Sequence, residues 1–181
     1  MQVWRLSRPE FARRLDGGGN RETGARWNSR GSGVVYTSRS LALCVLETIV
    51  HLPSARFVQG LVAVRIDVPD DAGVEVVAAA ELPHDRFAEE AAAWFRERGD
   101  RWLQAGSALV LVAPSVIVPQ EQSVMLNPRH PHAGRVRVEE AAPLRFRCAP
   151  VRRLAHDMTT SIGHHRAPAG VPARIGTHRQ A

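Results

Sequence analysis

Residues 24–51 of this chain have the sequence "GARWNSRGSGVVYTSRSLALCVLETIVH". They begin as a loop rich in glycine, arginine and serine and end in an apolar run with helical spacing. The pattern predicts a strand over residues 33–38 and a helix over residues 41–52, with a serine as its cap and a proline after it. Tyr36 lies on the predicted strand and Glu47 on the predicted helix, which places two polar side chains in an apolar framework.

The length and composition indicate a globular protein. The chain has 181 residues, which suits one domain with a sizeable core, and its apolar fraction of 44% is typical of such domains. No apolar stretch reaches the roughly 20 residues that cross a bilayer. Residues 1–11 lack the apolar core of a signal peptide. We therefore expect a cytoplasmic protein without membrane association.

The charge is +6, and all 24 basic residues are arginines. This composition is explained by a coding bias toward arginine or by affinity for phosphate, which the guanidinium group pairs with bidentately. The basic residues are scattered among acids, so the charge alone does not indicate nucleic-acid binding.

Cys44 and Cys148 are far apart, no disulfide is expected, and no Cys/His spacing resembles a metal site. Cys44 is predicted to pack as a small apolar side chain.

The rest of the chain alternates mainly between strands and turns. Further strands are predicted over residues 3–7, 57–69, 72–79, 107–119, 123–128, 135–140 and 144–148, a flexible loop over 17–20, and helical segments over 8–15 and 85–104, the second with Gly99 as a candidate point of division. Strands outnumber helices and do not alternate with them regularly, which favours an α+β fold. Residues 155–181 contain few large apolar side chains and are predicted to form a flexible tail.

Glu47 is the most informative polar residue. Its neighbours on the predicted helix are apolar, and a buried carboxylate needs a partner or a cavity. His51 follows one helical turn later and is a candidate partner. Glu47 is interpreted as a catalytic group or as half of a Glu–His metal pair, for which no third ligand is evident.

Other candidate site residues have structural explanations beside the functional ones. Arg26 follows a glycine-rich loop and either stacks on the next tryptophan or enters a site. Tyr36, the single tyrosine, either is half buried with a bonded hydroxyl or faces a ligand. Ser115 lies in a proline-flanked bend and is not in a Gly-x-Ser-x-Gly elbow, so a hydrolase nucleophile is not expected. Asn127 either caps the turn over residues 127–132 or belongs to a site.

Together these segments resemble the RES-domain toxins of bacterial toxin–antitoxin pairs. The matching stretches are residues 24–51, "LVLVAPSVIVPQEQSVMLNPRHP" at 109–131 and, less closely, "VWRLS" at 3–7 and "LRFR" at 144–147. The likeness extends over about residues 3–154. It implies a RES domain over residues 1–154, with the tail, 155–181, outside the family pattern.

The resemblance implies an ADP-ribosyltransferase-like split β-sheet with flanking helices around a cleft for NAD+. Many members of the family consume NAD+, so the expected activity is cleavage of its nicotinamide–ribose bond by hydrolysis or phosphorolysis. Mono-ADP-ribosylation of a protein is the alternative. NAD+ is then a substrate, no metal is expected, and the expected partner is a cognate Xre-type antitoxin that blocks the cleft. Nucleic acid would be contacted only through that antitoxin.

The family's Arg, Tyr, Glu and Ser fall on Arg26, Tyr36, Glu47 and Ser115. Arg26 and Tyr36 are also expected to contact NAD+, and Arg5 and Asn127 are further candidate contacts. The chain departs from the family pattern at Ala25 in place of glycine, at Ala113 in place of valine, at Ser123 where asparagine is frequent, and near residue 150, where an Asp-x-Arg-Leu pattern is missing.

Two rival functions remain from the residues themselves. The positive charge and the histidines at 51, 130 and 132 are consistent with a ribonuclease toxin. The chain has no cluster of aromatic residues typical of an RNA-binding platform, which argues against it. The second rival is a non-catalytic domain that binds a partner. This function does not explain why the carboxylate of Glu47 lies in an apolar setting.

Overall fold

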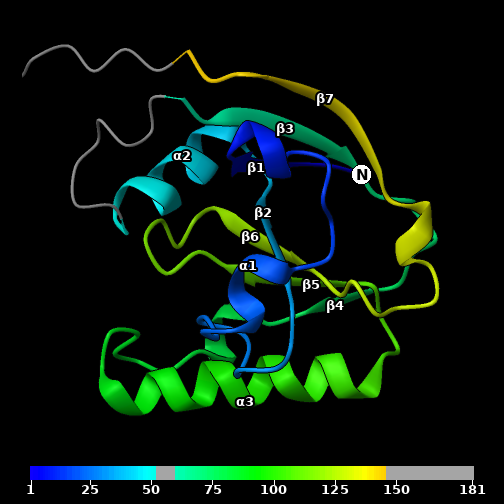
Figure 1. The fold of residues 1–181 in the computed structure, drawn as a ribbon. Helices are drawn as coiled ribbons and strands as arrows, with labels where there is room; N and C mark the ends of the chain where they lie inside the picture. Colours follow the sequence, from blue (N-terminus) through cyan, green and yellow to red (C-terminus); the bar gives the residue numbers. More distant parts are fainter. Residues whose placement is uncertain (52–59, 146–181) are drawn as a thin grey trace, which may run out of the picture. The chain divides into compact units, whose positions relative to one another are not determined.

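The computed structural model describes residues 1–51 and 60–145. Figure 1 shows the arrangement of the elements in this part of the chain. The strands are β1 (Gln2–Ser7), β2 (Val35–Ser38), β3 (Val62–Asp67), β4 (Val74–Val76), β5 (Val110–Pro114), β6 (Gln122–Leu126) and β7 (Arg137–Pro143). The α-helices are α1 (Gly18–Arg21), α2 (Leu41–Ile49) and α3 (Glu89–Ala105), and the short 3₁₀ turns are η1 (Pro9–Phe11), η3 (Ala79–Glu81) and η4 (Ala133–Arg135).

The strands form one seven-stranded sheet that is nearly divided in two. Its order is β4-β5-β6-β2-β1-β3-β7, and the β4–β5 pair is parallel while the others are antiparallel. β1 meets β2 only at Trp4 and Ser38, although it pairs with β3 over all six of its residues. The half made of β1, β3 and β7 therefore separates from the half made of β2, β4, β5 and β6. This geometry confirms the predicted α+β class with a split sheet.

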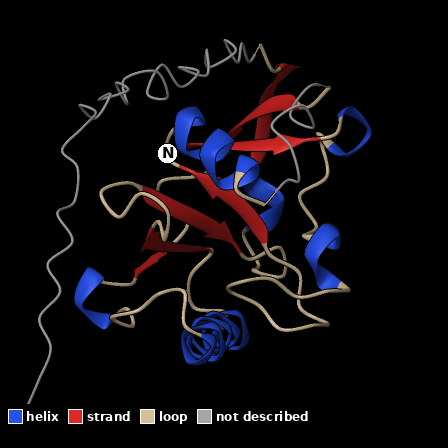
Figure 2. Ribbon diagram, turned by 90° about the vertical axis from the view of Figure 1, so that its left-hand side faces the viewer, coloured by secondary structure: helices blue, strands red, loops and turns tan. Residues whose placement is uncertain are grey.

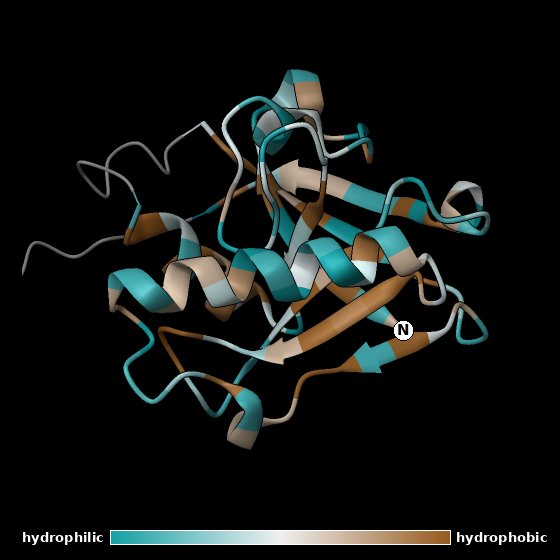
Figure 3. Ribbon diagram, turned by 90° about the horizontal axis from the view of Figure 1, so that it is seen from below, coloured by the Kyte–Doolittle hydropathy of each residue, from teal (hydrophilic) through white to brown (hydrophobic). Residues whose placement is uncertain are grey.

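Helix α3 covers one face of the second half-sheet. Its buried residues are Ala91, Phe95, Gly99 and Trp102, a spacing that places them on one side of the helix. They pack with inward-facing strand residues such as Leu111, while the neighbouring valines of β5 belong to the core on the opposite face of the sheet. Figure 2 shows α3 end-on below the strands, and Figure 3 shows many hydrophilic residues on its outer side.

The predicted division of this helix at Gly99 is wrong. α3 is continuous from Glu89 to Ala105, and Gly99 is fully inside its packed face. A Cβ atom at this position would lie 2.7 Å from the carbonyl carbon of Trp27 and closer still to its oxygen. Glycine is therefore present because another backbone segment crosses the helix here, and the helix tolerates its lower propensity.

Several predicted boundaries also differ from the structure. Residues 18–21 form α1 rather than part of a flexible loop, since Asp16 Oδ1 accepts the Gly18 N–H at 2.9 Å and starts the turn. The strand predicted over residues 107–119 is shorter in the structure, where it is β5, and the strand predicted over 72–79 is reduced to β4. The strand predicted over 135–140 is β7, which begins and ends later in the chain. Within the helical segment predicted over 8–15, only the 3₁₀ turn η1 forms. Leu144 and Arg145 are not in a strand, and residues 146–148 lie outside the described residues.

The described part of the chain contains no helix that is long and apolar enough to cross a membrane. The predicted tail over residues 155–181 lies outside the described residues, as does the beginning of the strand predicted from residue 57.

Candidate active site

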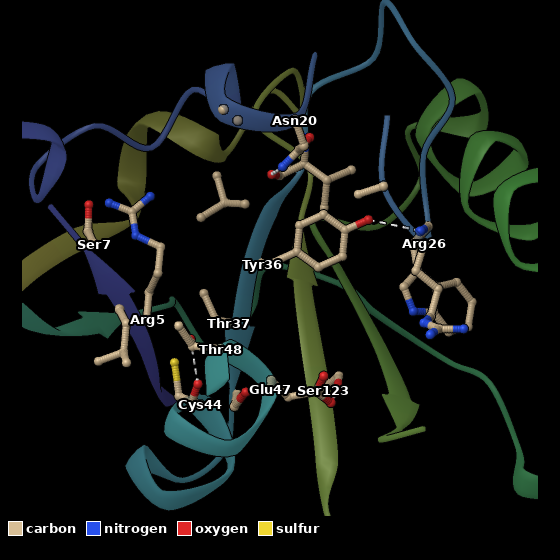
Figure 4. A pocket seen from close by; sticks show the side chains of 18 of the residues that line it. Arg5, Ser7, Asn20, Arg26, Tyr36, Thr37, Cys44, Glu47, Thr48 and Ser123 are labelled. Carbon is tan, nitrogen blue, oxygen red and sulfur yellow. Dashed lines mark hydrogen bonds between the residues drawn. The ribbon is translucent and has the colours of Figure 1, made fainter. Parts of the chain in front are cut away.

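A cavity of about 880 Å³ opens where the two half-sheets separate. Beyond the Trp4–Ser38 pair, β1 and β2 diverge, so that Arg5 from β1 and Tyr36 from β2 both line the space between them. Figure 4 shows these side chains around the cavity, with Glu47 on α2. Strand divergence thus creates the site, because the two strands stop pairing before either strand ends.

One face of α2 forms a wall of this cavity. The helix is capped by Ser40, whose Oγ accepts the Leu43 N–H at 3.1 Å. The cavity-lining residues of α2 and of the turn after it are Cys44, Glu47, Thr48 and His51, and both Glu47 and Thr48 lie three or four residues from Cys44 and from His51, which places the set on one face. The sequence pattern predicted the helix and the cap correctly.

The carboxylate of Glu47 is held by two serines. Its Oε1 accepts hydrogen bonds from Ser115 Oγ at 2.7 Å and from Ser123 Oγ at 3.2 Å. These serines come from the end of β5 and from β6, so the carboxylate on α2 is tied to the second half-sheet. Within residues 1–51 and 60–145, no hydrogen bond joins Glu47 to His51, the partner that helical spacing had suggested.

Ser115 is fully buried and its hydroxyl has a defined direction. Its Oγ accepts the N–H groups of Ile117 and Val118 at 3.1 and 3.0 Å. Both acceptor positions of the hydroxyl are thereby occupied, and its one proton points to Glu47. The structure places Ser115 behind the carboxylate, outside the set of residues that line the cavity.

We expect Ser115→Ala to lower the free energy of unfolding by about 1–3 kcal/mol, because two partly buried N–H groups lose their acceptor and Glu47 loses its shorter hydrogen bond. Ser123→Ala is the matched control, since Ser123 contributes a single, longer bond to the same oxygen, and we expect about 1 kcal/mol or less. Urea titrations of both variants measure the difference. Equal losses would contradict the defined role of the Ser115 hydroxyl.

The hydroxyl of Tyr36 is committed inside the protein. It accepts the backbone N–H of Trp27 at 2.8 Å and donates to Asn28 Oδ1 at 2.8 Å. Burial raises the pKa of Tyr36 far above its ordinary value, so the phenol is neutral at physiological pH. The ring, and not the hydroxyl, is what Tyr36 presents to the cavity.

Arg26 and Arg5 lie on opposite sides of Tyr36 in Figure 4. The guanidinium of Arg26 lies 5.2 Å from the centre of the Phe95 ring, and its Nη1 donates to the Arg86 carbonyl at 3.4 Å. Arg26 is one of the residues that line the cavity.

The guanidinium of Arg5 is used mainly to support the cavity wall. Nη1 donates to the Arg14 carbonyl at 2.8 Å, and Nη2 donates to those of Phe11 and Ala12 at 3.0 Å each. Desolvation lowers the pKa of Arg5. Its Nε is buried and has no hydrogen-bond partner among the described residues. The contact between Arg5 and NAD+ stays a prediction.

The structure does not bring Asn127 or the loop histidines to the cavity. Asn127 is buried, and its Oδ1 accepts the Arg129 N–H at 2.9 Å, which makes it a turn residue. His130 accepts the His132 N–H through Nδ1 at 3.1 Å, and neither residue lines the cavity that includes His51. The predicted NAD+ contact of Asn127 stays a prediction, and the three histidines do not gather in this cavity.

Cys44 packs as a small apolar side chain, as the sequence predicted, and is 6% exposed. Burial raises the pKa of its thiol to about 12. The thiol is therefore protonated at neutral pH and does not act as a nucleophile, although it lines the cavity.

The raised pKa of Cys44 predicts a loss of stability in alkali. Below about pH 9 the thiol is neutral in both states, whereas between about pH 9 and 12 it ionises only in the unfolded chain. The free energy of unfolding should then fall by up to about 1.4 kcal/mol per pH unit. Urea titrations of the parent and of Cys44→Ala at pH 7, 9 and 10 compare the slopes, and the contribution of Tyr36 cancels because both proteins contain it. The same slope in both proteins would contradict this assignment.

The sequence pattern did not indicate a role for Ser123 or Asn28, which are hydrogen-bonded in the structure to Glu47 and Tyr36, respectively. The one available signal was that Ser123 departs from the family pattern. In the part of the chain that the structure describes, no three His, Cys, Asp or Glu side chains form a group that could hold a metal ion.

The protein is therefore an α+β protein with a split sheet and a candidate site in the cavity between the two half-sheets. A carboxylate, an aromatic ring and an arginine line this cavity. The family model "RES domain" matches residues 2–148, and the chain belongs to this family. The resemblance of the sequence to RES domains is thereby confirmed.

Curated relatives in other bacteria match most of the chain. A protein of Sphingobium sp. (strain YBL2) named "Prs ADP-ribosylating toxin" is 38% identical over 76% of this chain and 88% of its own length. A "Toxin Res" of Pseudomonas putida is 34% identical over 79% of this chain and 97% of its own, and a "Toxin Res" of Yersinia enterocolitica is 30% identical over 72% and 86%.

A solved structure has the same fold. The matched chain in the crystal structure of the Mycobacterium tuberculosis MbcT–MbcA toxin–antitoxin complex superposes with a TM-score of 0.64 at 17% identity. The match covers 79% of this chain and 83% of that one. At this identity the likeness concerns the fold.

Proposed function

We propose that this protein is the toxin of a bacterial toxin–antitoxin system and that it cleaves the nicotinamide–ribose bond of NAD+. The observation that carries the proposal is the Glu47 carboxylate, fixed through one oxygen by Ser115 and Ser123 at the wall of a cavity. Membership of the RES domain family and the toxin names of its curated relatives support the same function.

The chemistry requires a negative charge beside the sugar. As the bond from ribose C1′ to the nicotinamide nitrogen breaks, its electron pair neutralises the pyridinium, and the ribose develops oxocarbenium character. A carboxylate fixed next to that ribose stabilises the growing positive charge, as in glycoside cleavage. The two serines hold Oε1 of Glu47, and within the described residues Oε2 has no hydrogen bond. Oε2 is therefore the oxygen that stabilises the positive charge on the ribose.

Tyr36 and Arg26 bind the two ends of the substrate in this proposal. The ring of Tyr36 stacks on the cationic nicotinamide, an interaction worth on the order of 0.5–2 kcal/mol. The guanidinium of Arg26 pairs with the pyrophosphate, for which its fork geometry is suited. Both side chains line the same cavity as Glu47.

The acceptor of the ADP-ribosyl group is water, phosphate or a protein side chain. In each case a new bond to C1′ forms, and the acceptor loses a proton. The Sphingobium relative is named as ADP-ribosylating, so mono-ADP-ribosylation of a protein is the second candidate activity. The solved structure with the same fold is a toxin–antitoxin complex, which supports a cognate antitoxin as partner, and we propose one of the Xre type.

The proposal is tested by incubating the purified protein with NAD+ and measuring free nicotinamide by chromatography, in phosphate buffer and in a phosphate-free buffer. Total RNA is incubated in parallel. We expect nicotinamide release and intact RNA. ADP-ribose as the second product indicates water as the acceptor, and ADP-ribose 1″-phosphate indicates phosphate. RNA fragments without nicotinamide would overturn the proposal in favour of a ribonuclease.

A further inference from the structure

Asn28 is a fully buried amide whose hydrogen-bonding groups are all in use. Its Nδ2 donates to the carbonyls of Ser32 at 2.7 Å, Ser29 at 3.2 Å and Asn20 at 3.3 Å, and its Oδ1 accepts the Tyr36 hydroxyl at 2.8 Å. A buried amide with such partners permits one arrangement of the surrounding loop. The carbonyls on one side and the hydroxyl on the other also fix which end of the amide faces Tyr36.

The Tyr36 hydroxyl connects Asn28 to the backbone of Trp27. Its single proton is donated to Asn28, so its oxygen is directed toward the Trp27 N–H, 2.8 Å away. Without the acceptor on Asn28, the hydroxyl would be free to rotate, and the Trp27 N–H would lose a directed partner.

The backbone carbonyl and the ring of Trp27 are also held in place by contacts. Its backbone carbonyl fits against Gly99, and its ring makes edge contacts with Phe95, centroids 5.0 Å apart, and with Trp94 at 6.3 Å. Arg26 lines the cavity and precedes Trp27 directly, so the anchors of Trp27 set where the Arg26 backbone lies.

We infer that Asn28 is a positioning residue of the NAD+ site, which acts through the Tyr36 hydroxyl and Trp27 to place Arg26 against the pyrophosphate. The inference rests on the proposed function. It separates the two parts of Tyr36: the ring faces the nicotinamide, and the hydroxyl holds the loop that carries Arg26.

The test compares nicotinamide release by Asn28→Asp, Tyr36→Phe and the parent. A carboxylate at position 28 cannot donate to the loop carbonyls, and Phe keeps the ring while removing the hydroxyl. Because Arg26 binds the substrate and transition state alike, we expect KM for NAD+ to rise about tenfold with kcat changed less than about threefold. Thr23→Ala, an exposed hydroxyl in the same loop, is the control and should leave both constants unchanged.

A double-mutant cycle distinguishes positioning of Arg26 from a general loosening of the loop. The Kd for NAD+ is measured by calorimetry with Glu47→Gln as the background, in which NAD+ is expected to be consumed at least about 10²-fold more slowly. In that background Tyr36→Phe should weaken binding about tenfold, but by less than about twofold when Arg26→Ala is also present.

An active parent whose KM is unmoved by Tyr36→Phe would overturn the inference alone, as would additive effects in the cycle. A parent protein that neither binds nor cleaves NAD+ would overturn the proposed function and the inference with it. If Asn28→Asp does not fold, Tyr36→Phe decides, since it removes one hydroxyl and adds no charge.

Discussion

Glu47→Gln is expected to lower nicotinamide release from NAD+ by at least about 10²–10³-fold while leaving the fold intact. A neutral amide cannot stabilise the positive charge that develops on the ribose, and electrostatic groups of this kind contribute about 3–4 kcal/mol to a barrier. The amide oxygen can still accept the hydrogen bonds from Ser115 and Ser123, so the link between α2 and the sheet is retained. The substitution thus removes the charge and keeps the shape.

The measurement is the initial rate of nicotinamide release, with circular dichroism and a urea titration as checks on folding. Glu97→Gln is the matched control, because Glu97 lies on the surface of α3, 75% exposed, in an ion pair with Arg101. It should keep the parent rate. A folded Glu47→Gln protein that consumes NAD+ at the parent rate would disprove the proposed mechanism.

Gly99→Ala is expected to lower the free energy of unfolding by about 3 kcal/mol or more. In an exposed helix the same change stabilises by about 1 kcal/mol, because alanine has the higher helix propensity. Here the new methyl group would overlap the Trp27 carbonyl, and backbone cannot yield as a flexible side chain does. Either α3 or the loop that carries Arg26 must move, so we also expect a rise in KM for NAD+.

Gly134→Ala provides the comparison, since a Cβ at that glycine would meet nothing within 4 Å. Its free energy of unfolding should stay within about 0.5 kcal/mol of the parent value. If Gly99→Ala proved as stable as the parent in urea, the close crossing of Trp27 over α3 would be refuted, and with it the anchoring of the loop.

The local pattern was sufficient for the elements that build the site. The serine cap and apolar spacing predicted α2, the alternation around Tyr36 predicted β2, and an apolar setting marked Glu47 as a carboxylate that needs partners. The local pattern was misleading at Gly99, because a glycine within a helical segment can mark either a break in the helix or a close contact with another backbone segment. Gly99 was a candidate point of division of the helix because propensity is a local property, whereas glycine is present because the backbone of Trp27, 72 residues away in the chain, crosses the helix there.

The family resemblance predicted a split sheet, but not where or how it splits. That β1 and β2 share one residue pair depends on how each strand pairs with its other neighbour, β3 or β6. The cavity between them is therefore a property of the whole sheet, and the inclusion of Arg5 follows from it.

The pattern of apolar and polar residues was enough to predict the α+β class, because element type is encoded by neighbouring residues, and the resemblance of the sequence was enough to predict the RES domain family. Only the tertiary structure decided which atoms meet: that Ser115 and Ser123 hold Glu47, that the Tyr36 hydroxyl faces Asn28 instead of the cavity, and that Asn127 lies elsewhere. Hydrogen bonds act over about 3 Å, and residues far apart in the chain reach that distance only once the sheet has closed around its core.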